Sequence, residues 1–361
     1  MTHRVVQHIT LVGDGIENPW NARTMIEAAR MFGGACVFRD RAGLSEAWRE
    51  VLPDAAPFEA TTRDALARDH APIVVCDTLD GAADVCGFAL PRDPDHAARP
   101  AVVVGNERRG IARDMQTLTQ HRVRIPMVSR QITCLNVAAA SAVVLYYLSR
   151  GGGGTLQHSV QPHRRRPELL LAGATDHVEL GSTIRSAAAF GWERLFVEDR
   201  AGVWFGVDRA TRSEGRAAAR RGRNAIRVVP ATQEAREGYE EVCVVTTRQD
   251  GVPLHRARLA GGARQLIAIP DEEAVDVLAE TWARRGKKAT LVNLDPPSGS
   301  FAYHYRLVAT LALAEIARQV GRPASGKIDQ PGRRGPSYDS MLGAPDEQPG
   351  EAVYLDELEI Y

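Results

Sequence analysis

The chain has 361 residues, of which 44% are hydrophobic, and this supports the cores of two domains of ordinary size. Its 45 basic and 45 acidic side chains cancel, so binding to a nucleic acid would require basic residues gathered on one face. No apolar run is long enough to span a membrane, and residues 1–10 lack the layout of a secretion signal, which predicts a cytoplasmic protein without a membrane segment.

The first 150 residues predict a parallel α/β sheet. Strands are indicated at 9–12, 35–38, 73–76 and near residues 102 and 123, and a helix at 21–32 ends at a Gly-Gly pair. An unbroken Ala/Val/Leu run after Asn136 predicts a buried helix to residue 148. Loops at the carboxyl ends of parallel strands form a ligand crevice, so we expect the polar loops after the last two strands to build one.

The pattern restarts in the second half of the chain. Residues 151–167 are rich in Gly, His, Gln, Pro and Arg, which predicts a flexible linker. Strands at 169–172, 195–197, 242–246, 266–269 and 291–294, with a helix at 301–319, then repeat the first half. We therefore predict two domains, residues 1–150 and 168–320, followed by a Gly-, Pro- and acid-rich tail, residues 321–361, that is disordered.

Two loops of the first domain carry specific motifs. Residues 105–111 read GNERRGI, and residues 125–127 read IPM and are followed by Leu135, Asn136 and Val137. Together they resemble the second and third motifs of the SPOUT methyltransferases, in the SpoU/TrmH branch. The loop after the IPM motif is one residue longer than the family pattern, and Cys134 replaces its usual Ser.

The resemblance implies a fold and a cofactor. The fold is α/β, with two tandem α/β-knot domains, each a parallel sheet; the first would carry the family's trefoil knot, and the second is degenerate. The cofactor is S-adenosylmethionine, and the residues assigned to it are Gly105, Asn106, Glu107, Ile125, Met127 and Leu135. The five cysteines lack C-x-x-C spacing, so neither a metal site nor a disulfide framework is predicted.

The family's first motif is incomplete in the first half. Residues 18–33 keep Asn21 but carry Arg23 and Glu27 where the family has a Gly and its catalytic Arg. A methyltransferase built on this copy alone should be crippled.

The second half carries the complementary copy of this motif. Residues 176–191 keep Gly181 and Arg185 but have Glu179 at the Asn position, and this half lacks the glycines of the cofactor loop. In the family, the Arg of one subunit reaches the cofactor pocket of its twin. We therefore predict an internal pseudo-dimer, able to act as a monomer, whose single site joins the first domain's loops to Arg185.

The resemblance assigns catalysis to Arg185, Asn21 and Asn136. A guanidinium is always protonated, so Arg185 would clamp a phosphate or stabilise a developing alkoxide rather than act as a base. The alternatives are structural: Arg185 as a surface arginine paired with Glu179, and the two asparagines as helix N-caps. Glu27 is expected to pair with Arg23 at i, i+4, or to act as a substitute base.

Basic residues cluster despite the neutral total. One group comprises Arg212, Arg216, Arg220, Arg221, Arg223 and Arg227, and a second comprises Arg164, Arg165 and Arg166. Such runs attract phosphates, and we assign Arg220, Arg221 and Arg223 to RNA binding, against the alternative of a solvated helix face. The first-choice function is therefore S-adenosylmethionine-dependent methylation of a ribose 2′-hydroxyl in ribosomal or transfer RNA. A small-molecule methyltransferase and a non-catalytic RNA-binding protein stay open.

Overall fold

The structure, a computed structural model, describes residues 8–78, 81–91, 99–106, 108–119, 121–129, 131–150, 166–232, 238–257, 259, 265–271, 274–299 and 304–320. The predicted tail, residues 321–361, and residues 151–165 of the predicted linker lie outside the described residues.

The first domain is a seven-stranded parallel sheet in the order β3-β2-β1-β6-β4-β7-β5. Its strands are β1 (Thr10–Asp14), β2 (Ala35–Arg39), β3 (Glu59–Ala60), β4 (His70–Cys76), β5 (Ala83–Asp84), β6 (Arg99–Gly105) and β7 (His121–Arg124). Its helices are α1 (Pro19–Met31), α2 (Leu44–Val51), α3 (Arg63–Asp69), α4 (Arg113–Gln116) and α5 (Val137–Leu148).

The second domain is a seven-stranded parallel sheet in the order β10-β9-β8-β13-β11-β14-β12. Its strands are β8 (Glu168–Ala172), β9 (Arg194–Val197), β10 (Arg227–Pro230), β11 (Glu241–Thr246), β12 (Val252–Pro253), β13 (Gln265–Pro270) and β14 (Lys288–Asn293). Its helices are α6 (His177–Ala189), α7 (Arg209–Ala218), the short 3₁₀ helix η1 (Arg221–Arg223), α9 (Val275–Arg284) and α10 (Tyr305–Val320).

The two sheets have the same strand order when each strand of the first is replaced by its counterpart in the second. The central strands β1 and β8 are buried throughout, as expected for parallel strands covered on both faces. The correspondence pairs α1 with α6 and α5 with α10. We call residues at matching places in these elements equivalent positions.

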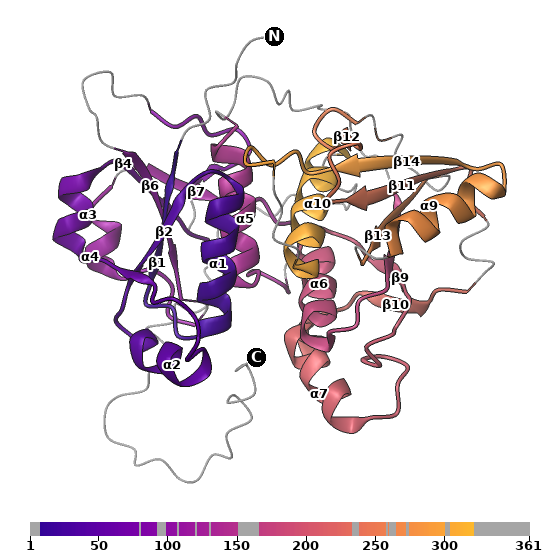
Figure 1. The fold of residues 1–361 in the computed structure, drawn as a ribbon, viewed down its shortest axis with the longest axis horizontal. Coiled ribbons are helices and arrows are strands. Elements are labelled where there is room, and N and C mark those ends of the chain that lie inside the picture. Colours follow the sequence, from indigo (N-terminus) through magenta and orange to yellow (C-terminus); the bar gives the residue numbers. More distant parts are fainter. Residues whose placement is uncertain are drawn as a thin grey trace.

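Four helices lie between the sheets, α1 and α5 from the first domain and α6 and α10 from the second (Figure 1). Their apolar side chains belong to one hydrophobic cluster that runs through both domains. α5 is apolar all round and almost fully buried, which is the pattern of a core helix. The two domains therefore share a core.

A pseudo-two-fold axis runs through the packing of α5 on α10. The hydroxyl of Tyr147 donates to Glu315 Oε2 at 3.1 Å, and these two residues occupy equivalent positions. Equivalent residues contact each other only at a symmetry axis of an isologous interface. The chain is thus arranged like a dimer of its own halves.

The predicted strands are confirmed, and so are the helices, except that α10 begins at Tyr305 and not at residue 301, and residues 301–303 of that prediction lie outside the described residues. The first helix begins two residues before the predicted residue 21, because Asn18 caps it by accepting from the backbone N–H groups of Trp20 and Asn21. The interpretation of Asn21 as the N-cap is therefore wrong. None of the described helices is long and apolar enough to cross a membrane.

Candidate functional site

The loop after β6 depends on two glycines. Asn106 and Gly110 pair through two backbone hydrogen bonds of 3.2 and 2.8 Å, which closes the loop on itself. A Cβ on Gly105 would lie 2.3 Å from the carbonyl carbon of Gly110, and Gly110 has a φ of +65°. Only glycine fits both positions, so the motif first fixes the backbone.

The side chain of Asn106 holds this loop in place. Its Nδ2 donates to the carbonyl of Gly15 at 2.9 Å, and its Oδ1 accepts from the backbone N–H groups of Arg108 and Arg109. The loop is therefore tied to the one after β1. Glu107, also assigned to the cofactor, lies outside the described residues.

Asp14, which the sequence analysis did not single out, also holds the loop after β6 in place. It is fully buried at the end of β1, and its Oδ2 accepts from the backbone N–H of Ala112 at 2.7 Å. Its Oδ1 lies 3.5 Å from Arg39 Nη1 and 3.1 Å from Arg41 Nε. The signal in the sequence that could have identified Asp14 is an acidic residue at the end of a predicted apolar strand.

The loop after β7 offers unpaired backbone groups. Ile125 and Leu135 are buried, and Met127 is half-buried. Within the described residues, the backbone groups of Met127 and Leu135 make no hydrogen bond. Because buried backbone groups are nearly always paired, this loop suits a ligand that supplies donors and acceptors.

Asn21 and Asn136 join the first turns of two helices at this loop. Asn136 caps α5 by accepting from the backbone of Ala138 and Ala139, as predicted, and its Nδ2 donates to Asn21 Oδ1 at 3.0 Å. Both side chains are buried. Two helix N-termini therefore converge here, and their dipoles favour negative charge.

The second domain reaches this loop through α6. The backbone N–H groups of Val128 and Ser129 donate to the carbonyl of Ala189 at 3.0 and 3.3 Å. Arg185 lies one turn earlier on the same helix and is 3% exposed. The interpretation of Arg185 as a surface arginine is therefore wrong.

A matching contact occurs on the other side of the pseudo-axis. The backbone N–H of Ser298, in the loop after β14, donates to the carbonyl of Met31 at 3.4 Å. Met31 ends α1 as Ala189 ends α6. The two domains thus exchange equivalent loop-to-helix contacts.

The equivalent of the Asn21–Asn136 pair in the second domain is a charged cluster. Glu179 and His304 occupy those two positions, and His304 Nδ1 lies 3.5 Å from Glu179 Oε1. Glu27, the equivalent of Arg185, crosses from the first domain and hydrogen-bonds His304 Nε2. The same carboxylate pairs with Arg23 at 3.4 Å, as predicted, and Arg306 Nε lies 3.7 Å from Glu179.

The cluster changes the protonation of its members. Contacts with Glu179 and Glu27 raise the pKa of His304 to about 9, so the ring carries a proton at neutral pH. The hydrogen bond with His304 lowers the pKa of Glu27. Burial raises the pKa of Glu179, but His304 and Arg306 outweigh it and the net shift is downward. The cluster is an ionic contact between the domains.

The arginines of the predicted basic cluster differ in their burial and contacts. Arg216 donates to the carbonyls of Val203 and Trp204, so it braces a loop. Arg220, at the end of α7, has a φ of +49° and a buried Nε, while Arg223 is exposed. The backbone of Arg221 lies in η1, and its side chain lies outside the described residues.

Arg166 does not belong to a basic surface patch, contrary to the prediction. It is 9% exposed, its guanidinium lies 5.1 Å from the centre of the Trp192 ring, and its Nη1 donates to the carbonyl of Ala317 at 3.1 Å. Burial lowers its pKa to about 10. Arg164 and Arg165 lie outside the described residues.

No group of three or more His, Cys, Asp or Glu side chains is placed to hold a metal ion in the part of the chain that the structure describes. The cysteines that it places are unpaired thiols.

A comparison with family models finds a match in the first domain. Residues 8–146 match the model of the SpoU rRNA Methylase family. No curated protein matches the chain.

Solved structures give a partial likeness. A TrmH-family protein from Porphyromonas gingivalis is 23% identical over 42% of this chain and 61% of its own, with a TM-score of 0.31. The SpoU methyltransferase AviRb from Streptomyces viridochromogenes, in complex with AdoMet, is 21% identical over 42% and 61%, with a TM-score of 0.30. The A. aeolicus TrmH/SpoU tRNA modifying enzyme is 18% identical over 40% and 75%, with a TM-score of 0.30. The chain thus spans about 61% of the first two proteins, and the assignment of the first domain rests on the family model.

Proposed function

We propose, from the match of residues 8–146 to the model of the SpoU rRNA Methylase family, that the chain is an S-adenosylmethionine-dependent methyltransferase acting on RNA. Its acceptor is the ribose 2′-hydroxyl of a ribosomal or transfer RNA, and its one site combines the first domain's loops with Arg185. The observation that carries the proposal is the pair of hydrogen bonds from Val128 and Ser129 to the carbonyl of Ala189, one turn from Arg185.

The residues present fit the cofactor. The buried side chains of Ile125 and Leu135 offer an apolar wall for an adenine ring, and the unpaired backbone groups of Met127 and Leu135 suit its polar edge. The closed loop that contains Gly105 and Asn106 would contribute to the same cofactor site, and Glu107 stays assigned to it from the motif alone. S-Adenosylmethionine, when bound, would supply the methyl group for an in-line transfer, in which its S–CH₃ bond breaks as the bond to the acceptor oxygen forms, S-adenosylhomocysteine leaves and the hydroxyl proton passes to solvent.

Arg185 is assigned to this site by equivalence. Its counterpart Glu27 crosses the pseudo-axis to His304, the counterpart of Asn136. The same two-fold relation supports an approach of Arg185 to Asn136. There its permanent charge would bind a phosphate of the RNA or stabilise the alkoxide as it forms.

Asn21 and Asn136 would orient the acceptor ribose. Their amide pair already fixes the first turns of α1 and α5 relative to each other. Holding an acceptor oxygen in line with a bound methyl group can supply about 7–11 kcal/mol of the barrier reduction. The basic residues at and near η1, Arg220, Arg221 and the exposed Arg223, would hold the RNA backbone.

The proposal gives the chain one site rather than two. The equivalent place in the second domain holds the Glu27–His304–Glu179 cluster, whose charges are already paired. The shared strand order supports an origin of the two domains by tandem duplication. The trefoil knot implied by the family stays a prediction.

Calorimetric titration with S-adenosylmethionine, followed by transfer of labelled methyl groups to RNA and nucleoside analysis, tests the function. We expect one cofactor per chain and label in a 2′-O-methyl nucleoside. Charge reversal at Arg220 and Arg221 should weaken RNA binding in a salt-dependent way and leave cofactor affinity unchanged. Two equal cofactor sites, or label confined to a small molecule, would contradict the proposal.

A further inference from the structure

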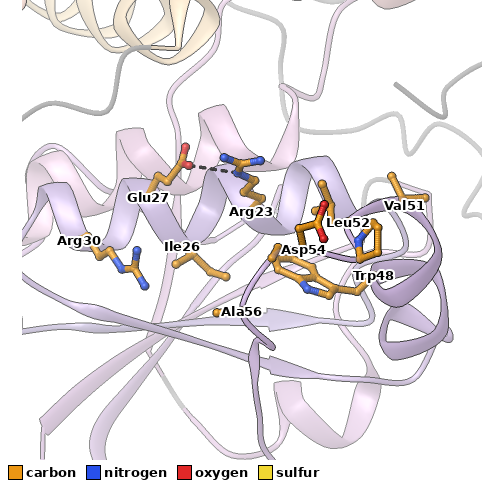
Figure 2. Close-up of a pocket in the computed structure, with 11 residues that line it drawn as sticks. Arg23, Ile26, Glu27, Arg30, Trp48, Val51, Leu52, Asp54 and Ala56 are labelled. Atoms are coloured by element: carbon orange, nitrogen blue, oxygen red, sulfur yellow. Dashed lines mark hydrogen bonds and ion pairs between the residues drawn. The ribbon is translucent and has the colours of Figure 1, made fainter.

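A cavity of about 530 Å³ lies outside the loops described above, between α1 and the segment that follows α2 (Figure 2). Its volume is within the range of small-ligand sites. Arg23, Ile26 and Arg30 enter it from α1, and Trp48, Leu52 and Asp54 from the other wall. The proposed function leaves this cavity without a role.

The cavity can be traced to one sequence difference between the domains. In the second domain Gly181 lets α7 pack directly on α6, since a Cβ there would lie 2.0 Å from the carbonyl oxygen of Gly215. The equivalent residue in the first domain is Arg23, whose side chain prevents such an approach by α2. The helices α1 and α2 are therefore held apart, and the space between them stays open.

The walls of the cavity present donors that lack partners. Among the described residues, the exposed guanidinium of Arg30 makes no hydrogen bond or ion pair. Trp48 is 5% exposed, and its indole N–H has no hydrogen-bond partner in the part of the chain that the structure describes. Arg23 pairs with Glu27, but Glu27 is also bound by His304, so its negative charge is shared. A ligand with negative charge would pair with the guanidinium groups of Arg23 and Arg30, with the ring of Trp48 in the wall beside it.

The other residues that line the cavity suit a nucleobase. Ile26 and Leu52 provide an apolar wall, and Asp54 at the rim is an acceptor for an exocyclic amino group. Arg23 and Arg30 are two helical turns apart, about 10 Å along the axis of α1. A nucleotide inside a strand has a phosphate on each side, whereas a mononucleotide has one.

We propose that this cavity binds one nucleotide of an RNA strand, with its base against Ile26 and Leu52 and its flanking phosphates on Arg23 and Arg30. The choice of RNA over a free nucleotide rests on the proposed function. The nucleotide held here is a different one from the nucleotide methylated, because the cavity is separate from the loops after β6 and β7.

Indole N–H resonances provide a test that does not depend on methyl transfer. The chain has five tryptophans, and Trp48→Phe identifies the Trp48 signal while keeping an aromatic ring. The protein without cofactor is titrated with a short oligocytidylate in one arm and with cytidine 5′-monophosphate in the other. We expect the Trp48 signal to shift on saturation with the oligonucleotide and to respond weakly to the mononucleotide.

Charge variants complete the test. Arg30→Gln should weaken oligonucleotide binding about tenfold and reduce the salt slope by about 0.7. Arg68→Gln, an exposed arginine on the opposite face of the sheet, is the matched control and should bind as the wild type does. An oligonucleotide that binds without shifting Trp48, or equally well to Arg30→Gln, would overturn the proposal while leaving the methyltransferase assignment intact. Equal binding of the mononucleotide would overturn the choice of RNA.

Discussion

The two domains have one strand order but carry different side chains at equivalent positions. Where the first domain joins Asn21 to Asn136, the second places Glu179 beside His304. The neutral amide pair leaves its loop open, whereas the charged pair draws Glu27 across the interface. A few side chains therefore turned one of two equivalent places into a contact between domains.

The contrast extends to the pseudo-axis itself. A dimer of identical chains would place two tyrosines or two glutamates against each other at the position of Tyr147 and Glu315. The fused chain pairs one of each, and the fully buried Glu315 also accepts from Arg318 and Gln319. Fusion thus permits an asymmetric hydrogen bond where symmetry would set like groups together.

The largest expected effect is on methyl transfer. Arg185→Ala should lower kcat by about 10²–10³-fold, the usual loss when one charge-stabilising donor is removed. Calorimetry should show an unchanged affinity for S-adenosylmethionine, since the loops that hold it belong to the other domain. Arg284→Ala, an exposed arginine on α9, serves as control and should keep full turnover.

Equivalent positions 23 and 181 should respond very differently to the same side chain. Gly181→Ala forces a Cβ against a backbone oxygen and should destabilise the protein by roughly 3 kcal/mol in urea unfolding. Arg23→Ala removes only a half-exposed ion pair and should change stability by less than about 0.5 kcal/mol. A similar loss of stability in Gly181→Ala and Arg23→Ala would contradict the different packing inferred at these two positions.

The charged cluster predicts a pH dependence. The pKa of His304 is raised from 6.5 to about 9, so its stabilising effect is complete below pH 6.5 and is lost as the pH rises through 9. The carboxylates Glu27 and Glu179, whose pKa values are lowered, contribute above about pH 4.5 and lose their effect in acid.

Comparison with His304→Gln isolates this effect from other titrations. The variant should be less stable by roughly 2 kcal/mol near pH 6, less than the full shift implies because both partners are partly exposed. The difference should shrink toward zero by pH 10 in urea unfolding curves. A difference that stays constant with pH would show that His304 acts through packing alone.

The smallest effect concerns the pseudo-axis. Tyr147→Phe should destabilise the protein by about 1 kcal/mol, because Glu315 keeps its other partners. Tyr146→Phe is the control, since the buried Tyr146 hydroxyl has no hydrogen-bond partner among the described residues and its removal should be neutral or stabilising. Thermal unfolding of both variants measures the difference.

Local patterns were sufficient to predict most of the fold. The β-branched strands, the helix stop at Gly33 and the apolar run of α5 are visible over a few residues, and all were confirmed. The repeat of these patterns also indicated a second domain. The motif at residues 105–111 could be recognised from the sequence because the backbone of this loop itself requires glycine at positions 105 and 110.

Contacts between distant residues were not visible in this way. Nothing near Glu27 in the sequence indicates His304, and the burial of Arg166 under α10 depends on how the second domain packs. The Gly181–Gly215 contact, and hence the cavity beside Arg23, likewise requires the packing of two helices. The periodicity of apolar residues identifies a single helix or strand, but it does not show which other element packs against it.

The central claim is that one chain completes its own site with Arg185. It is tested most directly by mixing two inactive variants, Arg185→Ala and Asn136→Ala, and measuring methyl transfer to RNA. Each variant chain lacks one part of the same site, so the mixture should remain as inactive as either variant alone. Recovery of a substantial fraction of wild-type activity would show that the site forms between chains and would contradict the claim.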